Sequence, residues 1–277
     1  MKPLAGKIAV VSGASRGAGR GIAVVLGEAG ATVYVAARTS KDVENVAAEV
    51  TARGGCGISV HADLSDEQQA AALFRRIEQE QGRLDVLANS AWSANFMAVW
   101  SRPFWELDSG IWRDTLGTVS VCWNTSAQAA RLMKGQGRGL IIHVTDNQHD
   151  NPSAHRGQIV HDLGHECINR LILSMSRELR KSRIAVVGLN PGFMRTEGVM
   201  KQMTTDAIKK RFRFDLSETV EYIGRAVAAL AADPDVFRKT GKLLWVAELA
   251  REYGFTDLDG RTIPIFDPKA PRQAFPC

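Results

Sequence analysis

Histidines gather in one short stretch of the 277-residue chain, where five of the six lie between residues 143 and 165: His143, His149, His155, His161 and His165. His161 and His165 are one helical turn apart, so their rings share a face of the helix expected over residues 156–181. An imidazole has an ordinary pKa of about 6.5 and exchanges protons near neutral pH. Asp146 can orient such a ring and stabilise its charged form. Asp146, His161 and His165 therefore have the side chains that acid/base chemistry requires.

The same residues allow other interpretations. Two histidines and a carboxylate have the composition of a two-histidine, one-carboxylate metal site. The spacing lacks the glutamate of an HExxH motif and is not specific, so we predict no bound metal and keep a metal site as the alternative. A binding protein that has lost turnover would also carry such histidines. For His143 the plainer expectation is a covered strand residue, and for His149 and His155 a polar loop.

A glycine-rich turn follows the first apolar run, Lys7–Ser12, and leads into a helical pattern. The glycines let the backbone turn tightly and approach a pyrophosphate, while the helix N-terminus offers free N–H groups and a positive dipole end. Strand, glycine turn and helix occur in the order that a dinucleotide site requires. The predicted contacts are Gly13, Ser15, Arg16, Gly17, Ala18 and Gly19.

The end of the second apolar run predicts which dinucleotide binds. An NAD site places an acid there to bond the ribose 2′-hydroxyl, but this run, 32–37, ends in Arg38. Arg16 adds a second cation from the glycine turn. Because arginine matches phosphate oxygens with a fork of donors, the pair favours a 2′-phosphate, and we predict NADP(H) as the cofactor.

The elements that must position these residues alternate along the chain. Short β-branched runs alternate with amphipathic stretches, a pattern typical of βαβ units and a parallel sheet covered by helices on both faces. The expected strands cover residues 7–12, 31–37, 57–61, 84–89, 139–145, 183–190 and 242–247. The expected helices cover residues 17–29, 42–53, 66–81, 109–134, 156–181 and 217–232. No composition break divides the chain, so we predict one doubly wound, Rossmann-like, three-layer α/β domain over residues 1–277.

Two segments without clear periodicity, near 91–108 and 192–216, follow strands and are the expected substrate loops. Aromatic and methionine side chains concentrate in and beside them. Trp92, Trp100 and Trp105 are candidates for an apolar or aromatic ligand pocket, whereas Trp112 and Trp123 are expected in a helix core. Phe96, Met97, Phe104, Phe193 and Met194 lie in the same two segments. We predict a bulky, apolar or aromatic small-molecule substrate.

Charge and composition point away from other classes of protein. The 35 Lys and Arg residues against 30 Asp and Glu give a net charge of +5, dispersed apart from a short run over residues 209–213, so no nucleic-acid partner is expected. No run approaches the roughly 20 apolar residues that span a membrane, and the start resembles no signal peptide. The four cysteines, Cys56, Cys122, Cys167 and Cys277, lack CxxC spacing and fit a reducing compartment, so we expect a cytoplasmic protein.

Several of these motifs together resemble the short-chain dehydrogenase/reductase family. Its phosphate loop has the form TGxxxGxG, which begins here with Ser12 and Gly13. Asp63-Leu64 is similar to the family's adenine-contacting Asp-Leu, and Asn89-Ser90-Ala91 to part of its NNAG. Pro191-Gly192-Phe-Met194-Arg-Thr196 resembles the PGxxxT segment that holds the nicotinamide carboxamide. The resemblance implies that these positions bind the cofactor.

Further residues resemble the subgroup of dehydrogenase/reductase family member one. They are Gly82–Leu87, Phe104–Glu106, Ala130–Met133, Tyr253-Gly254 and Asp257–Arg261. The family's habit of pairing through its fourth and fifth helices implies a homodimer or homotetramer.

The resemblance also implies that the catalytic centre is altered. The family uses a helical Asn, a Ser after the fifth strand, and Tyr-xxx-Lys in the fifth helix. Glu166–Leu171 is similar to the family's AALNRL and puts His161 at the tyrosine position and His165 at the lysine position. The serine position falls at Asp146 or, counted back from His161, at Gln148, and we prefer Asp146. The asparagine position falls at Val119.

Three functions follow as hypotheses. The first is an NADP(H)-dependent oxidoreductase that interconverts a carbonyl and an alcohol, with His161 as the proton donor or acceptor. The second is a non-redox lyase, isomerase or cyclase in which Asp146, His161 and His165 act as acid and base. The third is a catalytically silent NADP(H)-binding protein.

Overall fold

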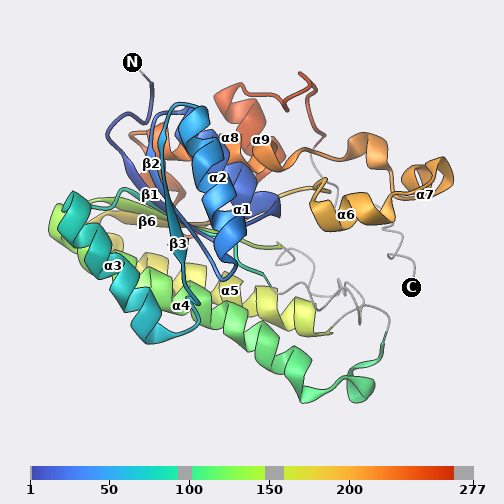
Figure 1. The fold of residues 1–277 in the computed structure, drawn as a ribbon, viewed down its shortest axis with the longest axis horizontal. Helices are drawn as coiled ribbons and strands as arrows, with labels where there is room; N and C mark the ends of the chain where they lie inside the picture. Colours follow the sequence, from blue (N-terminus) through green and yellow to red (C-terminus); the bar gives the residue numbers. More distant parts are fainter. Residues whose placement is uncertain (1, 93–101, 147–158, 265–277) are drawn as a thin grey trace.

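The computed structural model describes residues 2–92, 102–146 and 159–264. Within them, seven strands form one parallel sheet in the order β3-β2-β1-β4-β5-β6-β7 (Figure 1). The strands are β1 (Ile8–Ser12), β2 (Thr32–Ala37), β3 (Cys56–His61), β4 (Val86–Asn89), β5 (Gly139–Val144), β6 (Ile184–Asn190) and β7 (Leu243–Trp245). The strand order reverses between β1 and β4. In open parallel sheets, ligands bind beyond the carboxyl ends of the strands at such a point.

Helices cover both faces of the sheet (Figure 1). One face carries α1 (Gly17–Glu28), α2 (Ser40–Ala52), α8 (Val220–Ala232) and α9 (Val246–Tyr253), and the other carries α3 (Glu67–Gln81), α4 (Ser109–Gln136) and α5 (Ile159–Glu178). Alternate residues of β1 pack into two separate buried clusters. Ala9 and Val11 lie in the cluster on the first face, and Ile8 and Val10 lie in the cluster on the second. The predicted doubly wound, three-layer α/β fold is therefore confirmed.

Two expectations about the second half of the chain are wrong. The strand expected over 242–247 ends at Trp245, because Val246, Ala247, Leu249 and Ala250 recur at helical spacing and are buried on one face of α9. The segment after β6, expected to be irregular, contains the short helices α6 (Glu197–Gln202) and α7 (Asp206–Arg211). Each begins at a threonine N-cap, Thr196 and Thr205, whose hydroxyl accepts a backbone N–H bond.

Glycines allow α1 to pack closely on α8. A Cβ on Gly21 would lie 1.8 Å from the Val220 carbonyl oxygen, and one on Gly224 would lie 2.5 Å from the Gly21 carbonyl oxygen. This close contact fixes the direction of α1, whose N-terminus faces the glycine turn. Among the described helices, none is long and apolar enough to cross a membrane.

Candidate active site and cofactor site

The glycine turn packs against the end of β4. Gly13 has a φ of +66°, and a Cβ on it would lie 2.5 Å from the Ala91 Cα atom. A Cβ on Gly19 would lie 2.3 Å from the Gly13 carbonyl oxygen. Glycine is therefore required at both positions. The turn and Ala91 are two of the predicted cofactor-binding regions, and the fold brings them into contact.

Asn89 fixes the floor beneath this turn. Its side chain is buried, and its Oδ1 atom accepts hydrogen bonds from the hydroxyls of Ser12 and Thr125, each at 2.9 Å. The backbone N–H of Ser90 donates to the Ser12 carbonyl oxygen at 3.2 Å. The carboxyl ends of β1 and β4 are thus joined to each other and to α4. Thr125 was not predicted from the sequence.

A carboxylate lies on the N-terminus of α1. The backbone N–H of Gly17 donates to Glu197 Oε2 at 3.0 Å and to Oε1 at 3.3 Å. Thr196, the last residue of the predicted nicotinamide segment, lies beside the same glycine. An anion at a helix N-terminus is the arrangement expected for a cofactor phosphate, and here a side chain supplies it. The sequence prediction missed Glu197, although it directly follows the motif.

Two guanidinium groups near this turn are available to an anion. Arg16 and Arg38 are exposed, and among the described residues neither guanidinium has a hydrogen-bond or ion-pair partner. The Arg38 carbonyl oxygen lies 2.7 Å from His61 Nε2, which must carry the proton because a carbonyl can only accept. His61 therefore holds the backbone at the end of β2, a role that the sequence did not indicate.

Asp63 and Leu64, the predicted adenine contacts, follow β3. Asp63 Oδ1 accepts from the Ser65 backbone N–H at 3.0 Å and from its hydroxyl at 2.7 Å. The Leu64 side chain is buried, and its carbonyl oxygen accepts from Asn124 Nδ2 on α4 at 3.2 Å. Both residues lie at the carboxyl edge of the sheet, as predicted.

His161 and His165 lie together on α5, with ring centroids 4.4 Å apart. The indole of Trp92, which follows β4, stacks on His165 at a centroid distance of 4.0 Å and meets His161 edge-on at 5.6 Å. A Cβ on Gly164 would lie 2.8 Å from the indole, so a glycine is needed there for this stack. Trp92 was predicted to line the substrate pocket, and it is part of the histidine centre.

Hydrogen bonds fix the tautomer of His165. Its Nδ1 atom accepts the backbone N–H of Asp146 at 3.1 Å and lies 3.3 Å from the Thr145 hydroxyl. An Nδ1 acceptor means a neutral ring with its proton on Nε2. Asn169 supports this contact, because its Nδ2 donates to the Asp146 carbonyl oxygen at 3.2 Å and its Oδ1 accepts from Thr145 at 2.7 Å. Asp146 thus meets His165 through its backbone N–H.

The residue that follows His161 on α5 is a carboxylate that lies against its ring. Its Nδ1 atom lies 3.4 Å from Asp162 Oδ1, and its side chain is 11% exposed. A proton on Nδ1 can be donated to Asp162, and Nε2 is then the second ring nitrogen that can exchange a proton with a bound molecule. Adjacent residues of a helix point in different directions, so the sequence spacing did not suggest Asp162.

Three histidines of the cluster remain, and of these only His143 lies in the described part of the chain. His143 is fully buried in β5, and burial lowers its pKa from 6.5 to about 4, so it is a neutral core residue. His149, His155 and Gln148 lie outside the described residues, as do Trp100, Phe96 and Met97. Within the described ranges no group of three or more His, Cys, Asp or Glu side chains is arranged to hold a metal.

The predicted nicotinamide segment pairs with a second segment that the sequence did not connect to it. Met194 forms a parallel bridge with Glu218, whose backbone N–H donates to the Phe193 carbonyl oxygen at 2.9 Å. The Arg195 backbone N–H donates back to the Glu218 carbonyl oxygen at 2.8 Å. The backbone of residues 193–195 is therefore held by Glu218, which lies just before α8.

Glu218 itself is a buried acid. It is 1% exposed, and a Cβ on Gly192 would lie 2.9 Å from its Oε2 atom. Burial raises the pKa of Glu218 from 4.5 to about 8; the Gly192 backbone N–H opposes this shift and the charge of Asp257 adds to it. The carboxyl is thus largely protonated at neutral pH, beside the predicted cofactor segment.

Several aromatic residues lie on the surface. Trp112 and Trp123 on α4 are 41% and 58% exposed, so their expected place in a helix core is wrong. Trp105 is 74% exposed and meets Phe104, 59% exposed, edge-on. The exposure of α4 leaves an apolar face on the outside of the helix layer.

A family model described as short chain dehydrogenase matches residues 7–207. The chain is 36% identical to Dehydrogenase/reductase SDR family member 1 of Mus musculus over 273 residues, which cover 94% of this chain and 86% of that protein. The resemblance to this subgroup seen in the sequence is thereby confirmed.

Solved structures agree on the fold. A short-chain dehydrogenase/reductase variant of Serratia marcescens superposes with a TM-score of 0.75 at 29% identity, covering 88% of this chain and 97% of that one. A metagenomic short-chain oxidoreductase in complex with NADP gives a TM-score of 0.71 at 26% identity, with 88% and 97% covered. The second of these structures holds a dinucleotide on the same fold.

Proposed function

The chain belongs to the short-chain dehydrogenase/reductase family, and we propose that it is an NADP(H)-dependent oxidoreductase that interconverts a bulky, apolar or aromatic carbonyl and its alcohol. His161 is the proposed proton donor and acceptor, in place of the family's tyrosine. We propose the whole of 1–277 as one catalytic domain. The observation that carries the proposal is the pair His161 and His165 on α5, with Trp92 against both rings.

The residues present fit a dinucleotide. The cradle at Gly13 and Gly19 has no room for a Cβ, and the Gly17 N–H already binds a carboxylate as a stand-in for phosphate. The proposed diphosphate contacts are Ser15, Arg16, Gly17, Ala18 and Gly19, and the proposed contacts of the adenosine and nicotinamide ends are Arg38, Asp63, Leu64, Asn89, Ser90, Ala91, Pro191, Gly192, Met194 and Thr196. When bound, the nicotinamide supplies or accepts a hydride.

The chain's own contribution is proton transfer. Asp162 orients His161 through Nδ1, so Nε2 donates a proton to the carbonyl oxygen during reduction and removes it from the hydroxyl during oxidation. An imidazole has two ring nitrogens, so one can be held by Asp162 while the other passes the proton in either direction. His165, neutral and held by the Asp146 N–H, keeps its Nε2 proton as a donor toward the nicotinamide ribose. Trp92 excludes water from one side of both rings.

The preference for NADP(H) is supported by the guanidinium groups of Arg16 and Arg38, which have no partner among the described residues, and by a relative of the same fold that holds NADP. We expect NADPH to bind at least about tenfold more tightly than NADH, because the 2′-phosphate gains charged hydrogen bonds. Fluorescence titration of both cofactors checks this. In Arg38→Asp the order should reverse toward NADH, and tighter binding of NADH by the unaltered protein would contradict the assignment.

Turnover is tested with NADPH and a panel of aromatic and apolar carbonyls, followed by nicotinamide absorbance and product mass. We expect reduction, and a loss of about 10²–10⁴-fold in kcat for His161→Ala with the NADPH dissociation constant nearly unchanged. Added imidazole should restore part of the rate. Product without cofactor oxidation would favour a lyase, isomerase or cyclase, and silence in both channels would favour a binding protein.

We propose a homodimer that pairs through α4 and α5. Trp112, Leu116 and Trp123 share one exposed face of α4, and Leu163 on the neighbouring α5 is 44% exposed. Large apolar side chains exposed on one helix face mark an interaction surface, and a second copy would cover them symmetrically.

A further inference from the structure

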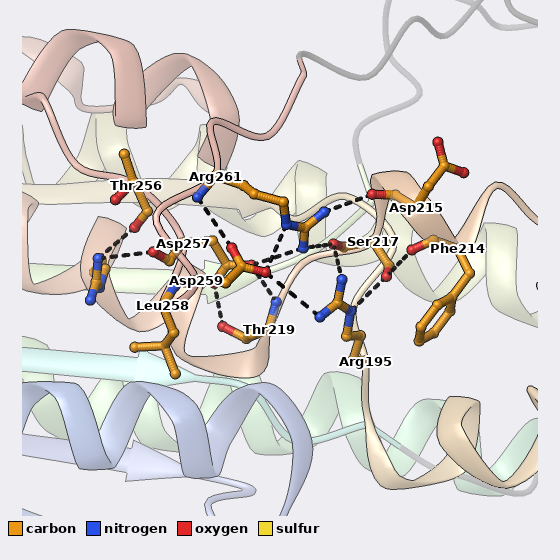
Figure 2. Close-up of polar contacts among 11 residues, drawn as sticks. Arg195, Phe214, Asp215, Ser217, Thr219, Thr256, Asp257, Leu258, Asp259 and Arg261 are labelled. Carbon is orange, nitrogen blue, oxygen red and sulfur yellow. Dashed lines mark hydrogen bonds and ion pairs between the residues drawn. The ribbon is translucent and has the colours of Figure 1, made fainter.

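The turn that follows α9, Asp257–Arg261, lies against the residues that precede α8 (Figure 2). It comes about sixty residues after the predicted nicotinamide segment, and neither the proposed proton transfer nor the cofactor contacts use it. Its two charged ends, Asp257 and Arg261, both point to the stretch over residues 215–219 (Figure 2). The turn is therefore a place where a segment late in the chain contacts the end of the predicted substrate loop.

Arg261 holds two carbonyl groups of the loop at once. Its Nη1 atom donates to the Asp215 carbonyl oxygen at 2.6 Å, and its Nη2 atom donates to the Ser217 carbonyl oxygen at 3.0 Å. Asp259 Oδ2 fixes the guanidinium from the other side, 2.7 Å from Nε. A planar fork with fixed spacing can bond two backbone carbonyls, whereas a single ammonium cannot occupy both positions.

Asp257 holds Thr219, two residues further along the loop than Ser217. It is 1% exposed, and its Oδ2 atom accepts the Thr219 backbone N–H at 2.9 Å while Oδ1 accepts the Thr219 hydroxyl at 2.5 Å. Arg225 of α8 secures the start of the turn, because its Nη1 atom donates to the Thr256 carbonyl oxygen at 2.6 Å. Both oxygens of the buried Asp257 carboxylate thus accept hydrogen bonds from Thr219. These bonds fix how the turn and the loop face each other.

The clamped stretch in turn holds Arg195. The Arg195 Nε atom donates to the Ser217 hydroxyl at 2.8 Å, its Nη2 atom donates to the Ser217 carbonyl oxygen at 3.3 Å, and its guanidinium lies 5.1 Å from the centre of the Phe214 ring. Arg195 and Arg261 thus share one carbonyl group (Figure 2). Arg195 stands between Met194 and Thr196, two proposed cofactor contacts, and its backbone is paired with Glu218.

We propose that the turn Asp257–Arg261 is a clasp that positions the segment Pro191–Thr196 for the cofactor, acting through residues 215–219 and Arg195. Arg261 and Asp257 are its positioning residues and touch neither cofactor nor substrate. The consequence for binding rests on the proposed function, whereas the clasp itself does not. A segment already ordered in the free protein loses less entropy when it binds, so the clasp raises cofactor affinity without adding a contact.

The test compares Arg261→Gln with Arg238→Gln. Within the described part of the chain, the Arg238 side chain pairs only with Asp235 on the surface, and it is itself 81% exposed. Hydrogen exchange of the full cofactor-free chain is measured over residues 191–197, and NADPH binding is measured by titration. We expect faster exchange in that segment for Arg261→Gln alone, and a roughly 3- to 10-fold weaker NADPH affinity. The kcat value, reached at saturating NADPH, should change less than the KM for NADPH. Arg261→Lys should restore exchange and affinity only in part.

Asp257→Asn serves as a second variant. It keeps one oxygen acceptor for Thr219 but loses the other, so it should loosen the same segment. Unchanged exchange over 191–197 in both variants would overturn the clasp. The clasp would also be overturned if the two variants melted at a lower temperature but bound NADPH with the affinity of Arg238→Gln. Should the unaltered chain bind no dinucleotide, the proposed function fails while the exchange data still decide the clasp.

Discussion

Glu197 places a negative charge where a cofactor phosphate is expected. Its carboxylate accepts the Gly17 N–H at the start of α1, so a diphosphate and Glu197 compete for the same donor. Like charges a few ångströms apart at a protein surface repel by about 1 kcal/mol or more. Glu197→Gln keeps a hydrogen-bond acceptor but removes the charge. We therefore predict that NADPH binds about 3- to 10-fold more tightly to Glu197→Gln, as measured by fluorescence titration.

The matched control is Glu178→Gln, which removes an exposed charge from the far end of α5 and should leave the affinity unchanged. Weaker binding to Glu197→Gln would mean that the carboxylate helps to hold the cofactor instead of competing with it.

The buried carboxyl of Glu218 makes stability depend on pH. Its pKa in the folded protein, about 8, lies above the ordinary 4.5, so the folded state holds this proton more tightly than the unfolded state. The stabilisation is complete below about pH 4.5 and is lost as the pH rises through about 8. Glu218→Gln cannot ionise. We predict that its free energy of unfolding, from urea titrations, falls by less than that of the unaltered chain between about pH 5 and about pH 9.

Glu248→Gln, at an exposed position of α9, should follow the unaltered chain across the same range. Parallel curves for the unaltered chain and Glu218→Gln would show that the carboxyl is ionised in the folded protein at neutral pH.

At this scale, local spacing revealed some residues and not others. His161 and His165 share a helix face, and the glycine turn is continuous in sequence, so both could be recognised directly. Trp92, Asp162 and Glu218 could not, because their roles depend on contacts made only in the folded chain. Trp92 is about seventy residues from the histidines on which it packs, and Glu218 resembles an ordinary acid near the start of a helix until its burial is known.

The helix α1 carries the proposed phosphate site, and its position depends on two glycines at the contact with α8. Since a Cβ on Gly21 would overlap the Val220 carbonyl oxygen, the helices would have to move apart to admit it. We predict that Gly21→Ala lowers the free energy of unfolding by about 1–3 kcal/mol and weakens NADPH binding, because α1 shifts with its N-terminus. Urea unfolding and cofactor titration measure the two effects.

Gly135→Ala is the control, since this glycine of α4 has no atom within 4 Å of a Cβ and lies in a helix. That change should stabilise the chain by about 0.5–1 kcal/mol. Equal stability of the two variants would contradict the close packing of α1 on α8.

Elements with strong periodicity were predicted well. The alternation of β-branched runs and amphipathic stretches identified all seven strands of the described sheet and the main helices within a few residues. The errors occurred where apolar residues run together, as at Leu243–Ala247, since a strand and a buried helix start then look alike. The short helices α6 and α7 were missed because six residues contain too few turns to show a period.

The assembly is a property of the whole molecule. Burying the exposed face formed by Trp112, Leu116 and Trp123 against a second copy removes apolar surface from water. We predict a dimer in sedimentation velocity, and dissociation toward monomer for Trp123→Glu. Trp105→Glu, which changes an exposed tryptophan outside α4, should remain dimeric. A monomer at all concentrations would contradict pairing through this face.

The proposed function requires net hydride transfer at a centre where His161 and His165 take the proposed places of the family's tyrosine and lysine. The most direct measurement uses NADPH deuterated at both C4 positions with the carbonyl panel, and determines the label in the product by mass spectrometry. We predict one deuterium on the carbinol carbon for each NADPH oxidised, and little product in His161→Ala. Product without deuterium, or NADPH that binds but is never oxidised across the panel, would contradict it.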